Sequence, residues 1–305
     1  MQFSKTTSLA LVASLTLGGA VINALLSPRV EAQQSRRAQP MTLLTNEEKE
    51  ILSHQSIVYL DDGQGGLVKS LRIEGINVQI VSGLGKTDDV PNGLGNLIVG
   101  YNELRGFGDE RTGSHNLVVG QLNDYSRFGG LVVGRGNRIS GDWASVSGGG
   151  GNSASGEFSS VSGGNGGQAS GRWSSVSGGG GNTATERYAS VSGGFDNHAE
   201  ALGASVSAGR NNTATGDFAS VVGGFSNLAS GERATVSGGS QNQALARNSS
   251  ISGGSYNSTS GQSSSISGGS NNQAPASYSS VSGGSNRAAP GPSSWVAGTL
   301  VDLNY

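Results

Sequence analysis

The sequence predicts an all-β protein, a parallel β-solenoid built from coils of 15 residues, with a short helix and a few strands before it. Glycine fills 53 of the 305 positions, and it is a poor helix former. An aliphatic residue also recurs every 15 residues without a slip, and an internal repeat of this kind indicates a stacked repeat architecture. We expect these residues to form a core ladder: Val146, Val161, Val176, Val191, Val206, Val221, Val236, Ile251, Ile266 and Val281.

Each repeat follows the pattern Ser-Val-Ser-Gly-Gly-x-x-Asn-x-Ala-x-Gly, seen in residues 145–156. A 15-residue unit is too short for a helical hairpin, but it suffices for two short strands and two turns. Side chains alternate across a strand, so the valine points inward while the serines on both sides of it face water. The alanine column is the second inward position: Ala154, Ala169, Ala184, Ala199, Ala214 and Ala229.

Two further columns are candidates for special roles. Asparagine suits a left-handed turn position, and stacked asparagines can hydrogen-bond from coil to coil. This column contains Asn152, Asn182, Asn197, Asn212, Asn227, Asn242, Asn257 and Asn272. An interrupted aromatic column is expected to stack along one edge and to supply candidate binding residues: Trp143, Phe158, Trp173, Tyr188 and Phe218.

Residues 1–32 are predicted to be a signal peptide. Lys5 supplies a positive charge, Leu9–Leu26 is apolar, and Val30-Glu31-Ala32 is a small-residue cleavage site. The apolar run of about 18 residues is also long enough for a membrane helix, but Pro28 and the cleavage site favour the signal peptide. We therefore expect a bacterial protein that is secreted or held at the cell surface, with no membrane-spanning segment after cleavage.

The rest of the chain divides into four regions. Residues 33–55 form a linker and a short helix, which Thr45 and Glu48 begin as a capping box. Residues 56–91 form a small β region, and residues 92–296 form the repeat domain. Residues 297–305 form a capping tail. In the β region, the alternation of apolar and polar residues predicts strands over 56–60, 67–73 and 76–81.

The composition excludes several functions. The chain has no cysteine, so a disulfide framework, a cysteine-based zinc site and a thiol nucleophile are all excluded. Its net charge of −2 provides no basic face of the kind that binds nucleic acid.

We expect no catalytic site, no cofactor and no metal. Gly163–Gly167 lacks the Lys-Ser/Thr that completes a phosphate loop, and Asp61 and Asp62 are typical turn formers. The three histidines lie far apart in sequence: His54, His115 and His198.

The repeat resembles the head domain of YadA-like trimeric autotransporter adhesins, whose unit is close to Ser-Val-Ala-Ile-Gly-x-x-Ser-x-Ala-x-Gly. The Val, Ala and final Gly columns match over residues 92–296. The resemblance implies a left-handed parallel β-roll, a homotrimer, and binding to extracellular-matrix or glycan ligands. The sequence departs from the family at the second apolar strand residue, which is glycine here, and its period of 15 is longer than usual. It also shows no heptad-repeat stalk and no set of amphipathic strands for a membrane anchor.

The energetics also favour a homotrimer. Ordering one coil of 15 residues costs roughly 15–30 kcal/mol. One buried valine returns only about 1.5–3 kcal/mol. We expect several chains to pool their inward faces and so thicken the core.

The leading functional interpretation is an exported surface or extracellular structural or adhesion protein that binds through many weak, repeated contacts. An ice- or crystal-surface-binding solenoid is the alternative, because a flat face of regularly spaced hydroxyls can match a lattice. A glycan-active β-helical enzyme is a further alternative.

Overall fold

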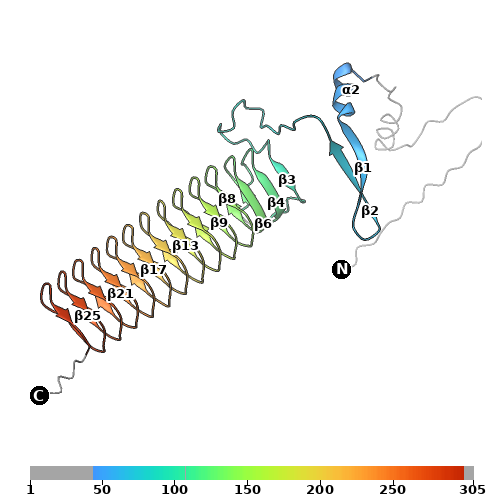
Figure 1. Cartoon of the computed structure of the whole chain (residues 1–305). Coiled ribbons are helices and arrows are strands. Elements are labelled where there is room, and N and C mark those ends of the chain that lie inside the picture. Colours follow the sequence, from blue (N-terminus) through green and yellow to red (C-terminus); the bar gives the residue numbers. More distant parts are fainter. Residues whose placement is uncertain (1–43, 107, 299–305) are drawn as a thin grey trace, which may run out of the picture. The chain divides into compact units, whose positions relative to one another are not determined.

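The computed structural model describes residues 44–106 and 108–298, which belong to two compact units divided between Val78 and Gln79 (Figure 1). Three predicted regions lie wholly or largely outside these residues: the signal peptide 1–32, most of the linker, and residues 299–305 of the predicted tail.

The first unit contains the predicted short helix and a hairpin. Helix α2 (Asn46–Ser53) begins at the predicted capping box: the Glu48 N–H donates to Thr45 Oγ1 at 3.1 Å, and the Thr45 N–H donates to Glu48 Oε2 at 2.7 Å. Strands β1 (Gln55–Asp61) and β2 (Leu67–Ile73) pair antiparallel. Between them, the Asp62 carboxylate accepts the N–H groups of Gln64 and Gly66, and these hydrogen bonds hold its pKa below the usual value.

The predicted strand over residues 76–81 is wrong. This segment alternates apolar and polar residues, but it pairs with no strand in the described part of the chain. Strand β2 is already paired with β1 along its whole length, so the hairpin leaves no free partner for a third strand on that side.

The second unit is the predicted parallel β-solenoid, with about 12 coils. Within its described residues, one 14-stranded sheet runs the length of the rod (Figure 1). Its strands are β3 (Leu97–Val99), β4 (Leu117–Gln121), β6 (Leu131–Arg135), β8 (Ser145–Val146), β10 (Ser160–Val161), β12 (Ser175–Val176), β14 (Ser190–Val191), β16 (Ser205–Val206), β18 (Ser220–Val221), β20 (Thr235–Val236), β22 (Ser250–Ile251), β24 (Ser265–Ile266), β26 (Ser280–Val281) and β27 (Trp295–Val296).

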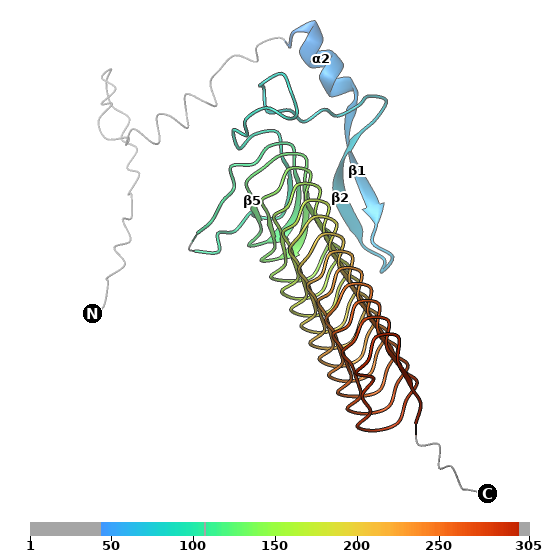
Figure 2. The same ribbon diagram turned by 90° about the vertical axis from the view of Figure 1, so that its left-hand side faces the viewer.

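The described coils also form an 11-stranded sheet, and Figure 2 shows them stacked with a common outline. This sheet contains β5 (Asp124–Tyr125), β7 (Arg138–Ile139), β9 (Ser153–Ala154), β11 (Gln168–Ala169), β13 (Thr183–Ala184), β15 (His198–Ala199), β17 (Thr213–Ala214), β19 (Leu228–Ala229), β21 (Gln243–Ala244), β23 (Ser258–Thr259) and β25 (Gln273–Ala274). A row of single bridges, such as Phe195 with Arg210, links the coils at a third place.

The core lies between the two sheets and is closed within one chain. The ten residues of the predicted core ladder are 0–1% exposed, and the six alanines of the second column are 0% exposed. A third inward column, which the sequence analysis missed, holds alanine in some coils, such as Ala189, and serine in others, such as Ser174. Because one chain already buries these side chains, pooling of inward faces between chains cannot be the reason for a trimer.

The first coils are shorter than the rest. Asn137 hydrogen-bonds to Asn123, 14 residues earlier, whereas Asn152 hydrogen-bonds to Asn137, 15 residues earlier. The 15-residue period therefore begins only after the strand that ends at Arg135.

Adjacent glycines in one turn have opposite requirements. Gly179 has φ +84°, and a Cβ on it would lie 2.0 Å from the carbonyl oxygen of Gly194 in the next coil. Gly178 beside it has an ordinary φ, and a Cβ there would meet no atom within 4 Å. Only the second glycine of the Gly-Gly pair is therefore required by the packing of this turn.

We expect Gly179→Ala to lower the free energy of unfolding by about 2 kcal/mol or more, because it adds left-handed strain to a backbone clash. Gly178→Ala is the matched control, and it should change the free energy by less than about 1 kcal/mol. Urea unfolding followed by circular dichroism measures both. Equal losses for the two variants would contradict this account of the turn.

Candidate functional site

The aromatic column lies on a single turn and is anchored by the backbone. Trp143, Phe158, Trp173, Tyr188 and Phe218 all have φ between 57° and 60°. The N–H of each is directed along the rod: that of Trp173, for example, donates to the carbonyl oxygen of Glu157 at 3.0 Å. The turn thus holds each aromatic residue at the same place in its coil.

The rings of three successive coils stack. The ring centroids of Phe158 and Trp173 are 5.9 Å apart with an interplanar angle of 9°, and those of Trp173 and Tyr188 are 5.0 Å apart at 5°. Phe128 contacts Trp143 edge to face at 5.4 Å, while Gly203 interrupts the column before Phe218. Phe158, Tyr188 and Phe218 are 41–53% exposed. We call these six aromatic residues the aromatic edge: Phe128, Trp143, Phe158, Trp173, Tyr188 and Phe218.

Arginines cover the rings of the stack. The guanidinium carbon of Arg172 lies 3.9 Å from the centroid of Trp173, and that of Arg187 lies 4.9 Å from Trp173 and 4.7 Å from Tyr188. Arg187 also donates to the Tyr188 hydroxyl at 2.9 Å. Cation–π contacts of this kind fix the arginines beside the rings and enrich the edge in hydrogen-bond donors.

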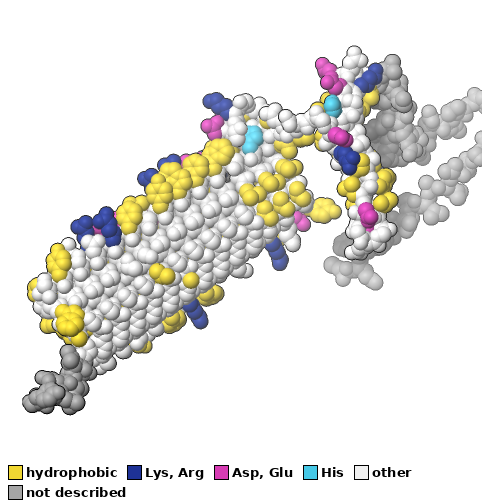
Figure 3. Space-filling model, viewed as in Figure 1, with side chains coloured by type: hydrophobic (Ala, Val, Ile, Leu, Met, Phe, Trp, Pro, Cys, Tyr) yellow, Lys and Arg dark blue, Asp and Glu magenta, His cyan; other side chains and the backbone are white. Residues whose placement is uncertain are grey.

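Acids pair with arginines from coil to coil along the same edge. Arg172 contacts Glu157 at 2.9 Å, and Arg127 donates to both carboxylate oxygens of Asp142, at 2.6 and 2.9 Å. The hydrogen bond to Asp142 raises the pKa of Arg127 further above its usual value. Figure 3 shows the resulting surface as a strip of hydrophobic side chains flanked by charges along one edge of the rod.

Sequence reasoning missed two members of this turn. Phe128 escaped because the first coils are shorter than 15 residues, so it falls out of the spacing that aligns the later rings. Tyr278 has φ 59° in the same turn and is 62% exposed. Counting backward from the strand register, rather than forward by a fixed period, would have found Phe128.

The asparagine column is structural, and its predicted position in a left-handed turn is wrong. The left-handed residue is the one before, such as Asp196 (φ 56°) before Asn197 and Asn211 (φ 57°) before Asn212. The asparagine needs its side chain inside, because that is where unpaired backbone groups of two coils meet. All eight predicted asparagines are at most 1% exposed.

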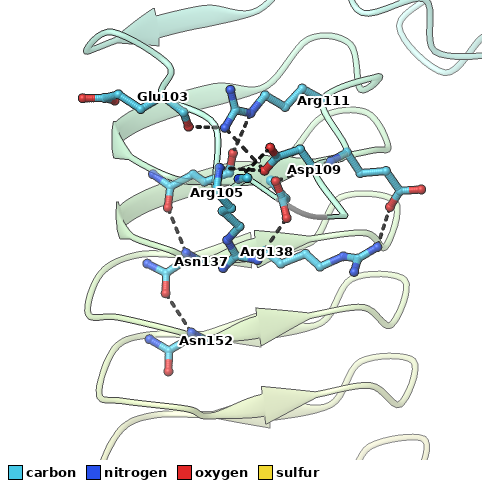
Figure 4. A network of polar contacts seen from close by, with 11 residues as sticks. Glu103, Arg105, Asp109, Arg111, Asn137, Arg138 and Asn152 are labelled. Carbon is cyan, nitrogen blue, oxygen red and sulfur yellow. Dashed lines mark hydrogen bonds and ion pairs between the residues drawn. The ribbon is translucent and has the colours of Figure 1, made fainter. Parts of the chain in front are cut away.

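Each amide of this ladder joins three backbone groups. Asn212 Nδ2 donates to the carbonyl oxygens of Ala208 and Gly224, both at 3.0 Å, and its Oδ1 accepts the N–H of Asn227 at 3.0 Å. Figure 4 shows the start of the ladder, from Asn137 to Asn152. The predicted hydrogen bonds from coil to coil are therefore confirmed.

Gly167 interrupts the ladder and provides a test of it. It lies where the neighbouring coils hold asparagine, its φ is not in the left-handed region, and a Cβ would lie 3.3 Å from Asn152 Oδ1 and from Val176 Cγ1. The adjacent coils accommodate an asparagine Cβ at the equivalent place.

We expect Gly167→Asn to raise the free energy of unfolding by about 1–3 kcal/mol, because it restores buried hydrogen bonds and restricts the unfolded chain. Gly167→Ala is the control, since it adds the Cβ without the amide. Thermal and urea unfolding of the two variants would measure the difference. An Asn variant no more stable than the Ala variant would rule out the hydrogen-bonding explanation.

A second polar cluster closes the beginning of the 11-stranded sheet (Figure 4). Arg105 reaches the buried Asp124 at 3.0 Å, and the Tyr125 N–H donates to the carbonyl oxygen of Glu110 at 2.8 Å. Burial acts to raise the pKa of Asp109, but N–H groups of Arg105 and Gly106 and the charge of Arg111 outweigh it and lower that pKa. This cluster covers the edge of strand β5 and was not predicted.

The histidines do not converge. His115 accepts the N–H of Ser82 at 3.0 Å and contacts the Thr87 carbonyl at 3.2 Å, beside a cavity of about 380 Å³. His198 Nδ1 lies 2.7 Å from Thr183 Oγ1, and its Nε2 lies 3.7 Å from Asp196 Oδ1. His198 and Thr183 lie on the outer face of the 11-stranded sheet, and neither His198 nor Thr183 lines that cavity.

In the part of the chain that the structure describes, no group of three or more His, Cys, Asp or Glu side chains could hold a metal ion. Within the same residues, no helix is long and apolar enough to cross a membrane. No protein-family model and no curated protein matches the chain.

Proposed function

We propose that the chain is an exported structural or adhesion protein, and that its aromatic edge binds an extracellular ligand. The observation that carries this proposal is the stack of Phe158, Trp173 and Tyr188 with Arg172 and Arg187 beside it. Exposed rings and clustered donors on a rigid scaffold provide both apolar contact and hydrogen bonding. We further propose that this surface acts by binding and not by catalysis.

A glycan is the ligand class that fits this chemistry best. The C–H faces of sugars pack on aromatic rings, and the hydroxyls of sugars bond to guanidinium and carboxylate groups such as Arg172 and Glu157. The edge repeats these groups at each coil, about 4.8 Å apart along the rod. A polymeric ligand can therefore make several weak contacts at once, which sum by avidity.

The resemblance to YadA-like heads supports the same proposal. The fold has the parallel coils that the resemblance implies, and the first coils have a 14-residue spacing, shorter than the later ones. Export through the predicted signal peptide is the route by which the rod would reach such a ligand. These points support a surface location and an adhesive role as part of the proposal.

The binding proposal is tested by replacing the two stacked rings. Trp173→Asn and Tyr188→Asn preserve the turn, because Asn248 occupies the same turn position with φ 56°. Each lost ring should weaken binding to glycan and matrix-protein arrays severalfold, and the double variant should lose about tenfold or more.

Phe225→Ala is the matched control, since this exposed ring lies in a different turn. It should leave array binding unchanged. Absence of any array signal from the unmodified protein, or equal losses in the control, would refute a ligand site at the aromatic edge. Release of sugar products during the assay would instead indicate an enzyme.

A second candidate rests on the serine rows. Exposed serines stand in register on the outer face of the 14-stranded sheet, from Ser147 to Ser282, with Val222 as an interruption. Such a flat array of hydroxyls favours binding to ice or to another crystal surface. A thermal-hysteresis measurement on the purified protein tests this alternative, and a null result would remove the ice-binding form of it.

A further inference from the structure

The outer face of the 14-stranded sheet changes character along the rod. In one row, Leu97 pairs with Leu117, Leu117 with Leu131, and Leu131 with Ser145. Beyond this point, serine or threonine fills the row as far as Ser280. A parallel row runs Val99, Val119 and Val133 before serines take over at Ser147.

The first three strands of this sheet therefore carry six outward aliphatic side chains. We call them the aliphatic patch: Leu97, Val99, Leu117, Val119, Leu131 and Val133. Leu97, Val99 and Leu117 are 48%, 53% and 39% exposed, and the other three are half-buried by their neighbours. Figure 3 shows a group of hydrophobic side chains at this end of the rod.

We propose that the aliphatic patch is a self-association surface, covered by the same patch of a second copy of this chain. This inference goes beyond the proposed function, because it involves a different face and needs no ligand. The patch is flat and its rows are in register, so two copies can pack face to face as the sheets of a β-sandwich do. None of its six residues is charged, so identical copies do not repel each other at the centre.

The surroundings of the patch match an interface between copies. Ser145 and Ser147 continue its two rows, and Gln121 and Arg135 end strands β4 and β6, which gives an apolar centre with a polar rim. Six partly exposed side chains supply less than the roughly 800 Å² per partner of a standard stable interface. Contact must therefore extend onto the serine rows, which the patch and its copy both possess.

The first unit independently exposes a second apolar surface. On one face of the hairpin, large side chains are 42–70% exposed: Ile57, Tyr59, Leu67, Leu71 and Ile73. A two-stranded hairpin is at best marginally stable alone in water. Both units thus concentrate exposed apolar surface in residues 44–133, which places association in that part of the chain.

The sheet itself supplies the test substitutions. Leu117→Ser, Leu131→Ser, Val119→Ser and Val133→Ser introduce the residue that both rows carry in the later coils, so the coils have a precedent for it. Val222→Ser is the control, because it removes a 48% exposed valine from the second row outside the patch. The full chain is expressed with export, so that any leader is processed as in the cell.

Sedimentation equilibrium at micromolar concentration should show the unmodified chain as an oligomer, with a mass of three chains if the homotrimer predicted from the sequence forms. The fourfold serine variant should dissociate at least tenfold more readily, with an unchanged circular dichroism spectrum, while Val222→Ser associates normally. An unmodified chain that sediments as one copy would overturn the proposal, as would a serine variant that associates equally well. So would a monomer that floats with phospholipid vesicles, since the patch would then face a membrane. None of these outcomes bears on array binding by the aromatic edge.

Discussion

The interaction on which the structure depends is the backbone hydrogen bond between one coil and the next, held in constant register. Ser175 donates to the carbonyl oxygen of Ala189, and Ser190 donates to that of Ala204, at 3.0 and 2.9 Å. Because the register repeats, every side chain is stacked against its own equivalents, as valine on valine and asparagine on asparagine. The environment of a residue is therefore set by its column, and each column has one steric and one hydrogen-bonding requirement along the rod.

This constraint explains which parts of the fold the sequence could predict. A column of identical residues reveals the inward position directly, so Val146 and Ala154 were placed correctly without coordinates. It does not show whether a column is selected for its backbone or for its side chain. Asparagine is common for both reasons, and the backbone explanation was wrong for Asn212, whose amide bonds three backbone groups. Residues 76–81 show the other failure, since alternation alone cannot supply a pairing partner.

The aromatic edge is harder to explain by stability alone. A bulky residue at positive φ is unfavourable, and glycine or asparagine would adopt this conformation with less strain, as at Gly203 and Asn248. Stacking offsets part of that strain where three rings are consecutive, but Phe218 follows Gly203 and has no stacked neighbour in the described residues. Strain kept in place without a compensating contact is typical of positions used for binding.

The two sheet edges at the start of the rod are treated differently, and the same register rule gives the reason. An exposed edge strand is a template for further pairing. Strand β5 is closed within the chain, because residues 105–113 pair with it and Arg105 binds Asp124. Strand β3 keeps an edge without a ladder partner in the described residues, and it begins the aliphatic rows. A protein that hydrogen-bonds one edge shut and lines the other with leucine and valine has limited sideways growth and left one apolar face for contact between copies.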